Sequence, residues 1–186
     1  MAYKDGEMII RPILEKDLPT LWELIYKDES PEWKKWDAPY FEHKPIPYQE
    51  YIDSKEKMIN QEDRWAIEVN GEVIGTINYY WEHQPSLWLE MGIGIYHPSY
   101  WNGGYGTKAL RLWITHLFQT MPLVRVGYTT WSGNERMIKV GEKLGMKMEA
   151  RLRKCRYYNG EYYDSIRMGI LREEWEAYLE LRRCNK

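Results

Sequence analysis

The sequence predicts an α/β fold in which one mixed sheet carries helices on both of its faces. Between residues 87 and 131, an apolar strand, a glycine-rich turn, a helix and a second apolar strand follow one another. This order is typical of a right-handed crossover, which joins two parallel strands. Asn70-Gly71 and Asn159-Gly160 each separate two strand-like segments, and Asn-Gly is a common turn of antiparallel hairpins. Parallel and antiparallel pairs in one chain together predict the mixed sheet.

The length and composition are those of one compact domain. The chain has 186 residues, of which 44% are hydrophobic, so we expect a single domain over residues 1–186 with a sizeable core. Its aromatic residues are 10 Trp and 16 Tyr against only 2 Phe. Trp and Tyr combine an apolar ring with a polar group, which suits a half-exposed cleft. A wide substrate cleft and a plain compositional bias explain this excess equally well.

Charge and cysteine content argue against several classes of partner. The 26 basic and 28 acidic side chains give a net charge of −2, which does not favour binding to nucleic acid. The chain has no apolar run near the ~20 residues that span a bilayer, and its first residues lack the apolar core of a signal peptide. Cys155 and Cys184 have no metal-binding spacing and are expected to be free thiols. We therefore expect a soluble cytoplasmic protein with no metal and no membrane partner.

The first elements expected are a strand and two helices on either side of a long irregular segment. Met8–Ile13 is an apolar strand, and Asp17 is placed to cap the helix that follows. Residues 30–47 contain four prolines, and a loop of this length is usually functional or mobile. A second helix is expected over Tyr48–Asn60. The first helix has one apolar face, made of Leu18, Leu21, Trp22 and Ile25.

Strands dominate the middle of the chain. The segments RWAIEV and VIGTINYYW flank the first Asn-Gly pair, and Leu87–Tyr96 forms the next strand. The helix after the glycine-rich turn buries one stripe at i, i+3, i+4, i+7 and i+8. That stripe consists of Leu110, Trp113, Ile114, Leu117 and Phe118.

The last third predicts a strand, a helix and a hairpin. Val124–Trp131 is the strand, and Ser132 with Glu135 fits a capping box at the start of the helix. Gly145 is a natural stop for that helix. The final hairpin has strands near Lys147–Tyr157 and Tyr162–Leu171.

The glycine-rich turn, PSYWNGGYGT at residues 98–107, is suited to binding an anion. Backbone N–H groups at the start of a helix have no intrahelical partner, and the helix dipole favours a negative charge there. A P-loop would need Gly-Lys followed by Ser or Thr, which is absent. A dinucleotide fingerprint would need G-x-G-x-x-G and an acidic residue on the next strand, and neither is present.

Residues 101–106, WNGGYG, fit the pyrophosphate-loop spacing Q/R-x-x-G-x-G/A of the GCN5-related N-acetyltransferase (GNAT) superfamily. The chain resembles the RimJ/RimL-like branch, the ribosomal-protein N-acetyltransferases, in which Trp at position 101 is usual. Four blocks carry this resemblance in order: LEMGIGIYHPSYW, YWNGGYGTKAL, NERMIKVGEKLGMKMEARLR and NGEYYDSIRMGILREEW. The resemblance covers nearly the whole chain. It implies a central mixed sheet of roughly six to seven strands, in which two parallel strands splay apart.

The resemblance also implies a binding site for acetyl-CoA. The pantetheine arm would lie along Ile93 and Ile95, where glycines at positions 92 and 94 permit a close backbone approach. Asn134 matches an asparagine that contacts the CoA arm, and a role as helix N-cap explains it about equally well. The pyrophosphate would lie on the N–H groups of Asn102, Gly103, Gly104, Tyr105, Gly106 and Thr107.

Glu90 matches the glutamate that the branch uses as general base. An aliphatic amine is protonated at neutral pH, so it must lose a proton before it attacks a thioester. The alternative is a strand glutamate that only attracts a cationic substrate. Three residues after Asn134 the branch often has a hydroxyl that protonates the leaving thiolate, whereas this chain has Met137. The thiolate then leaves without a general acid, or Ser132 or Tyr128 serves.

The acceptor pocket is expected between residues 30–47 and the last hairpin. Trp33, Trp36 and Tyr158 are the predicted substrate-binding residues, and Asp37 and Glu42 would favour a cation. For each aromatic residue taken singly, ordinary packing is the more common role. No histidine is given a catalytic or metal-binding role.

The resemblance therefore implies an acetyl-CoA-dependent N-acetyltransferase that acts on a primary amine. Candidate acceptors are a protein N-terminus, a polyamine or an aminoglycoside-like amine. The alternative is a non-catalytic acyl-CoA sensor or an interaction module with the same fold. A homodimer is compatible with the number of aromatic residues.

Overall fold

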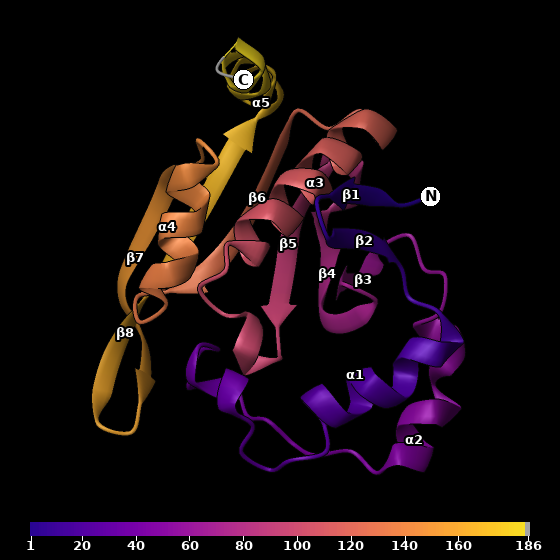
Figure 1. Ribbon diagram of the computed structural model, residues 1–186. Coiled ribbons are helices and arrows are strands. Elements are labelled where there is room, and N and C mark those ends of the chain that lie inside the picture. Colours follow the sequence, from indigo (N-terminus) through magenta and orange to yellow (C-terminus); the bar gives the residue numbers. More distant parts are fainter. Residues whose placement is uncertain (185–186) are drawn as a thin grey trace. The chain divides into compact units, whose positions relative to one another are not determined.

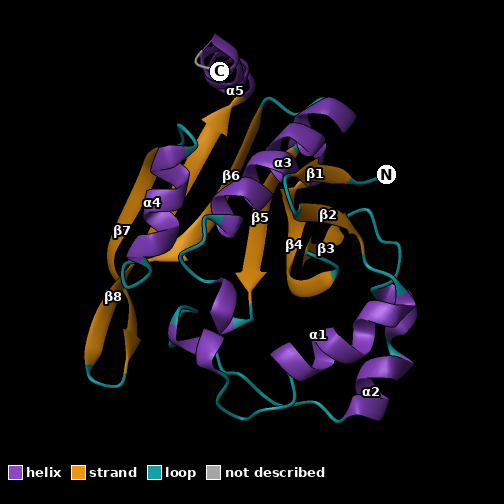
Figure 2. Cartoon of the chain, viewed as in Figure 1, coloured by secondary structure: helices purple, strands orange, loops and turns teal. Residues whose placement is uncertain are grey.

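The computed structural model describes residues 1–184, which form one mixed sheet with helices packed against it (Figures 1 and 2). The sheet has eight strands in the order β1-β2-β3-β4-β5-β6-β8-β7. The strands are β1 (Tyr3–Asp5), β2 (Met8–Pro12), β3 (Arg64–Val69), β4 (Glu72–His83), β5 (Trp88–Ile95), β6 (Arg125–Trp131), β7 (Lys147–Tyr158) and β8 (Glu161–Leu171). The helices are α1 (Leu18–Ile25), α2 (Tyr48–Asp53), α3 (Tyr105–Thr120), α4 (Glu135–Lys143) and α5 (Arg172–Cys184).

The described residues group into two compact units. The first contains Met1–Tyr79 and Gly92–Trp113, and the second contains Tyr80–Met91 and residues 114–184. Strands β4 and β5 and helix α3 each contribute residues to both units.

In the first unit, neighbouring strands from β1 to β4 pair antiparallel, and α1 and α2 lie in the connection between β2 and β3. The turn between β3 and β4 has positive φ at both of its central residues, 51° at Asn70 and 85° at Gly71. This geometry matches the right-handed twist of the strands, and only residues such as Asn and Gly adopt it readily. The predicted hairpin is confirmed.

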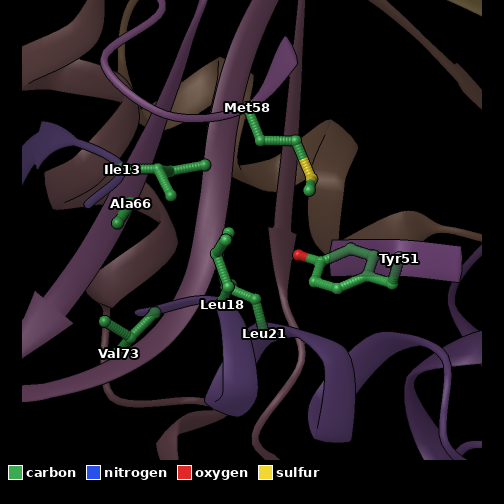
Figure 3. Close-up of a cluster of buried hydrophobic side chains, with 7 residues drawn as sticks. All are labelled: Ile13, Leu18, Leu21, Tyr51, Met58, Ala66 and Val73. Atoms are coloured by element: carbon green, nitrogen blue, oxygen red, sulfur yellow. The ribbon is translucent and has the colours of Figure 1, made fainter. Parts of the chain in front are cut away.

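Helices cover both faces of the sheet in the first unit, as predicted. Trp65 and Ala66 are neighbours on β3, so their side chains point to opposite faces. The ring of Trp65 lies 5.2 Å from the ring of Trp113 on α3. On the other face, α1 and α2 pack onto a buried cluster of Ile13, Leu18, Leu21, Tyr51, Met58, Ala66 and Val73 (Figure 3).

In the second unit, β6 pairs with β8 in antiparallel register from Arg125 opposite Leu171 to Trp131 opposite Ser165. The β7–β8 hairpin turns at Asn159-Gly160, again with positive φ at both residues. Figure 1 shows α4 lying along β7 and β8. The hydroxyl of Tyr128 on β6 donates to the carbonyl of Met137 on α4, at 2.7 Å.

Strands β5 and β6 are parallel, which confirms the predicted crossover through α3. Their register has one position, Glu90 opposite Gly127. The ladder between the two strands is therefore much shorter than the one between β6 and β8, as the predicted separation of the parallel strands requires.

Two elements were not predicted, and one was predicted too long. Strand β1 pairs with β2 and brings the sheet to eight strands, one more than the upper expectation. Helix α5 is anchored by Arg172, whose guanidinium donates to the carbonyls of Phe118, Met121 and Leu123. Helix α2 ends at Asp53 and not at the predicted Asn60. At this end, the hydroxyl of Ser54 donates to the carbonyl of Tyr51 at 2.8 Å.

Two of the three predicted helix caps are wrong in detail. Asp17 occupies the N-cap position of α1, but its carboxylate caps no helix N–H. It accepts instead from the N–H of Leu14 at 2.8 Å and pairs with Arg11 at 2.6 Å. The hydroxyl of Ser132 accepts from the N–H of Asp164, so α4 starts later than the predicted capping box, with Asn134 as its N-cap.

Candidate active site

The glycine-rich loop joins β5 to the N-terminus of α3 within the first unit. At its start, the Trp101 indole N–H donates to the carbonyl of Ile95, at 2.8 Å. At its end, Gly104 has φ +79°, a conformation that glycine adopts without strain. The N–H of Lys108 makes the first bond of the helix, to the carbonyl of Gly104 at 3.0 Å. The N–H groups of residues 105–107 precede this bond and have no intrahelical acceptor.

The loop backbone is open, and its predicted binding of a CoA pyrophosphate stays a prediction. A Cβ atom placed on Gly104 or Gly106 would have no heavy atom within 4 Å among the described residues, so the loop backbone is open to a ligand. Asn102 has φ +64°, and this conformation turns the chain just before Gly103 and Gly104. Three consecutive helix N–H groups and the dipole of a long helix are a suitable anion site.

The second half of β5 has less free space than predicted. A Cβ on Gly92 would meet the side-chain oxygen of Asn78 at 2.6 Å, and a Cβ on Gly94 would meet the ring of Tyr96 at 2.6 Å. These glycines therefore make room for the chain's own side chains. Ile93 and Ile95 are half-buried on this segment, and a role for them beside the pantetheine arm stays a prediction.

The predicted acceptor segment contacts the glycine-rich loop. The rings of Trp36 and Trp101 lie 6.2 Å apart at 89°, and the ammonium of Lys35 lies 4.8 Å from the Trp101 ring. Trp33 packs against Tyr96 at 5.4 Å, and its indole N–H donates to the carbonyl of Leu24 at 3.0 Å. Trp36 is thus next to the loop predicted to bind the donor, whereas Trp33 is next to the end of β5.

The two carboxylates predicted to favour a cation are already paired with lysines. Asp37 lies 2.9 Å from the ammonium of Lys34, and Glu42 lies 3.2 Å from that of Lys44. Because each acid is neutralised by its neighbour, this segment attracts a cation less than its acidic residues alone suggested.

Glu90 lies in the second unit and is completely buried, with 0% exposure. Its Oε1 atom accepts from the indole N–H of Trp88 at 3.1 Å and from Nη1 of Arg125 at 3.0 Å. Its Oε2 atom is buried and accepts no hydrogen bond from residues 1–184. A buried carboxylate oxygen without a donor is costly, so such a group is a candidate for contact with a ligand or water.

Charged and phenolic groups from three other strands, β4, β6 and β8, lie near Glu90. Nη1 of Arg167 on β8 lies 3.9 Å from Glu90 and 3.7 Å from Glu82 on β4. Burial, followed by the charges of Glu90 and Glu82, raises the pKa of the Tyr80 hydroxyl. Burial lowers the pKa of Arg125, but hydrogen bonds and charges from Glu149 and Glu90 raise it more, so Arg125 stays cationic.

Asn134 acts as a helix cap. Its side-chain oxygen accepts from the N–H of Met137 at 3.1 Å, which confirms this one of its two predicted roles. Contact with the CoA arm stays a prediction.

The two hydroxyls offered as general acids differ in their hydrogen bonding. Tyr128 is 1% exposed and donates to the carbonyl of Met137, and burial raises its pKa. Ser132 accepts from the N–H of Asp164 at 3.0 Å. Tyr128 already donates its proton within the fold, whereas the bond to Ser132 leaves the Ser132 O–H unused, so a role for Ser132 as general acid stays a prediction.

Tyr158 is exposed on β7, beside the hairpin turn. The rings of its neighbours Tyr157 and Tyr162 lie 4.9 Å apart across the hairpin. An exposed aromatic surface at a hairpin tip is suitable for contact with an acceptor, and this role of Tyr158 also stays a prediction.

Sequence reasoning missed the arginines beside Glu90. Arg125 and Arg167 each stand two residues before a strand glycine, Gly127 and Gly169. Side chains at i and i+2 share a face of a strand, so this pattern was a usable signal for Arg125, which lies across the bare backbone of Gly127.

Within residues 1–184, no helix is both long and apolar enough to cross a membrane. The same residues contain no group of three or more His, Cys, Asp or Glu side chains placed to hold a metal ion. Cys155 and Cys184 are exposed free thiols.

The strand, the glycine-rich loop and the long helix occur in the order that the resemblance to the GNAT superfamily predicts. The model of the acetyltransferase (GNAT) domain family matches residues 7–147. The chain therefore belongs to the GNAT acetyltransferase family.

Similar proteins agree with this assignment. The chain is 28% identical over 177 residues to the "Putative ribosomal N-acetyltransferase YdaF" of Bacillus subtilis (strain 168), covering 90% of this chain and 93% of the relative. It is 26% identical over 170 residues to the spermidine N(1)-acetyltransferase of Escherichia coli (strain K12), covering 90% and 88%. These relatives place the chain in the RimJ/RimL-like branch and make it an N-acetyltransferase.

A solved structure shares the fold. The spermidine N-acetyltransferase from Vibrio cholerae, in complex with CoA and spermine, aligns with a TM-score of 0.74 at 19% identity. The alignment covers 92% of this chain and 99% of that one.

Proposed function

We propose that this N-acetyltransferase uses acetyl-CoA to acetylate a primary amine directly, with Glu90 as general base. The observation that carries the proposal is the environment of Glu90. One carboxylate oxygen is fixed by Trp88 and Arg125, while the other is buried and free to accept a proton. A general base must present an unoccupied lone pair to the proton that it removes.

The donor would be held by the glycine-rich loop. The N–H groups of residues 102–107 would bind the pyrophosphate, and the edge of β5 at Ile93 and Ile95 would lie along the pantetheine arm. Acetyl-CoA supplies an activated acyl group. The family and the CoA-bound relative support this choice of donor.

The reaction needs a neutral amine and a thioester carbonyl in contact. The amine nitrogen attacks the carbonyl carbon, a C–N bond forms, the C–S bond breaks, and CoA leaves as thiolate. Glu90 would accept the proton of the amine at Oε2, directly or through one water molecule. Burial of Glu90 excludes bulk water from this step.

The acceptor would be a polyamine or a protein N-terminus. One relative is named for spermidine and another for ribosomal proteins. Both acceptors present a primary ammonium, which suits the aromatic rings of Trp33, Trp36 and Tyr158. Within the second unit, Glu82 and Glu90 both lie near Arg167, and Glu90 also pairs with Arg125, so the charge of these carboxylates is balanced.

We further propose that residues 1–186 act as a single domain in the cytoplasm, where exposed thiols such as those of Cys155 and Cys184 stay reduced. A homodimer is part of the same proposal, and sedimentation measurements would test it.

The test is release of CoA thiol from acetyl-CoA in the presence of spermidine, spermine, aminoglycosides and peptides with free N-termini. We expect turnover that depends on one class of amine, with a product mass increased by one acetyl group. Binding of acetyl-CoA without turnover on any amine would overturn the proposal.

A further inference from the structure

Two glycines lie side by side on strands β6 and β8, next to Glu90. In the strand register, Glu90 of β5 is opposite Gly127 of β6, and Gly127 is opposite Gly169 of β8. Glycine weakens a strand because it adds no side-chain packing and orders a flexible backbone. Adjacent glycines in two strands therefore indicate that something must lie close to the backbone at that point.

The space over these glycines is filled by an ion pair. A Cβ on Gly169 would collide with the carboxylate of Glu149, which comes from β7. A Cβ on Gly127 would collide with the guanidinium of Arg125 and lie 2.6 Å from the carbonyl oxygen of Met168. The two glycines thus form a shallow trough across β6 and β8, in which Arg125 and Glu149 lie flat against the sheet.

One end of the Arg125 guanidinium in this trough reaches Glu90. Nε and Nη2 of Arg125 both donate to Glu149, with Nε to Oε2 at 3.0 Å, while Nη1 donates to Oε1 of Glu90 at 3.0 Å. A guanidinium is planar and rigid, so fixing one edge on Glu149 fixes the direction of the other edge. Glu149 therefore sets the position of a carboxylate that it does not touch.

We propose that Arg125, held by Glu149 in the Gly127–Gly169 trough, is a positioning residue that turns the carboxylate of Glu90 so that Oε2 faces the acceptor. This inference rests on the proposed function, because it gives Glu90 the role of base. In the proposed reaction, neither Arg125 nor Glu149 touches a reacting atom.

A role in stability alone explains the arrangement poorly. The side chains of Arg125 and Glu149 are 21% and 36% exposed, and partly exposed ion pairs contribute little to stability. Two glycines weaken their strands, and an ion pair of this kind does not offset that loss of stability. Precise orientation of a general base, by contrast, changes rate steeply with small displacements.

The experiment compares Glu149→Gln, Arg125→Gln and the double variant in steady-state kinetics on the best amine. We expect each single variant to lower kcat by about 10- to 100-fold, with KM for the amine and Kd for acetyl-CoA within about twofold of wild type. The double variant should be no slower than Arg125→Gln, because Glu149 acts through Arg125. Glu142→Gln, which removes an exposed carboxylate from α4 in the same unit, is the matched control and should keep the wild-type kcat.

Gly169→Ala tests the same inference without removing a charge. Its Cβ would displace only the end of the Glu149 side chain, so the strand should fold and kcat should fall as in Glu149→Gln. If Arg125→Gln fails to fold, Glu149→Gln and Gly169→Ala carry the test. An active wild type with unchanged kcat in both variants would overturn the inference alone. A wild type that turns over no amine would overturn the proposed function, and this inference with it.

Discussion

Trp36 of the acceptor segment packs edge-on against Trp101 at the start of the glycine-rich loop, with ring planes at 89°. The sequence suggested that Trp36 lines the acceptor pocket. The structure places it beside Trp101, whose indole N–H fixes this loop to the end of β5 through a bond to the carbonyl of Ile95. A contact of this kind links the segment of residues 30–47 to the loop predicted to bind the donor.

Removal of this ring should therefore weaken donor binding. We expect Trp36→Ala to raise the Kd of acetyl-CoA by roughly 2- to 10-fold, the equivalent of one aromatic pair of about 0.5–1.5 kcal/mol. Trp33→Ala is the matched control, because Trp33 contacts Tyr96 and Leu24 and not the loop. That variant should raise KM for the amine and leave the Kd of acetyl-CoA unchanged. Calorimetry that gives Trp36→Ala the wild-type Kd would show that the two rings are not coupled.

Gly104 should be indispensable for donor binding. Its φ of +79° is strained for any β-branched residue, and a valine side chain would also stand among the N–H groups of the helix start. We expect Gly104→Val to abolish measurable acetyl-CoA binding in calorimetry while the far-ultraviolet circular dichroism stays that of the wild type.

The control for Gly104→Val is Gly71→Val. Gly71 has φ +85° and equally open space around it, but it lies in the β3–β4 turn. The Gly71→Val variant should have lower stability and an unchanged affinity for acetyl-CoA. Equal loss of affinity in both variants would attribute the effect to backbone strain and not to the loop.

Local patterns predicted the fold well where one physical rule dominated. The Asn70-Gly71 turn requires positive φ at two residues, and few other pairs adopt it. The stripe from Leu110 to Phe118 is completely or almost completely buried, because a 3.6-residue period leaves one face for the core. Glu90 and the loop were predicted as site residues because the family resemblance covers them, and their roles stay predictions.

The rest depended on partners distant in the sequence. Asp17 has the residue type and position of a helix cap, yet Arg11 and the N–H of Leu14 bind its carboxylate instead. Arg125 and Glu149 are 24 residues apart, and only the pairing of β6, β8 and β7 brings them together. No local pattern reports such a pairing.

Asp17 should make stability depend on pH. Burial raises the pKa of its carboxyl, but the hydrogen bonds from Arg11 and Leu14 and the charge of Arg11 lower it more, so the net pKa lies below the usual value. The side chain is 3% exposed. Loss of its charge leaves Arg11 partly buried without its main partner, and we expect Asp17→Asn to lower the free energy of unfolding by about 3 kcal/mol at pH 7.

The sign of this pH dependence follows from the lowered pKa. The ionised carboxylate stabilises the fold above the unfolded-state pKa of about 3.9, and this contribution disappears as the pH falls through the lower folded-state pKa. Denaturant melts of wild type and Asp17→Asn should therefore differ at pH 7 and converge in acid. A difference that stays constant down to pH 2 would assign the effect to packing and not to charge.

Glu90→Gln should separate chemistry from binding. Glutamine keeps the shape of the side chain, and its carbonyl oxygen is still able to accept from Trp88 and Arg125, but the group no longer removes a proton. We expect turnover at pH 7 to fall by roughly 10²- to 10⁴-fold, the usual contribution of a general base. The Kd of acetyl-CoA should hardly change, because the loop that is proposed to hold the donor lies elsewhere on the chain.

The pH dependence of this defect distinguishes a base from a residue that only attracts a cation. At higher pH a larger share of the amine is already neutral, so the loss caused by Glu90→Gln should shrink as the pH rises towards the pKa of the acceptor. The matched control is Glu82→Gln, which removes a carboxylate near Arg167, the arginine that also lies near Glu90. The effect of Glu82→Gln should appear in KM for the amine and stay the same across the pH range. Near wild-type turnover of Glu90→Gln at pH 7 would reduce Glu90 to a structural or attracting role.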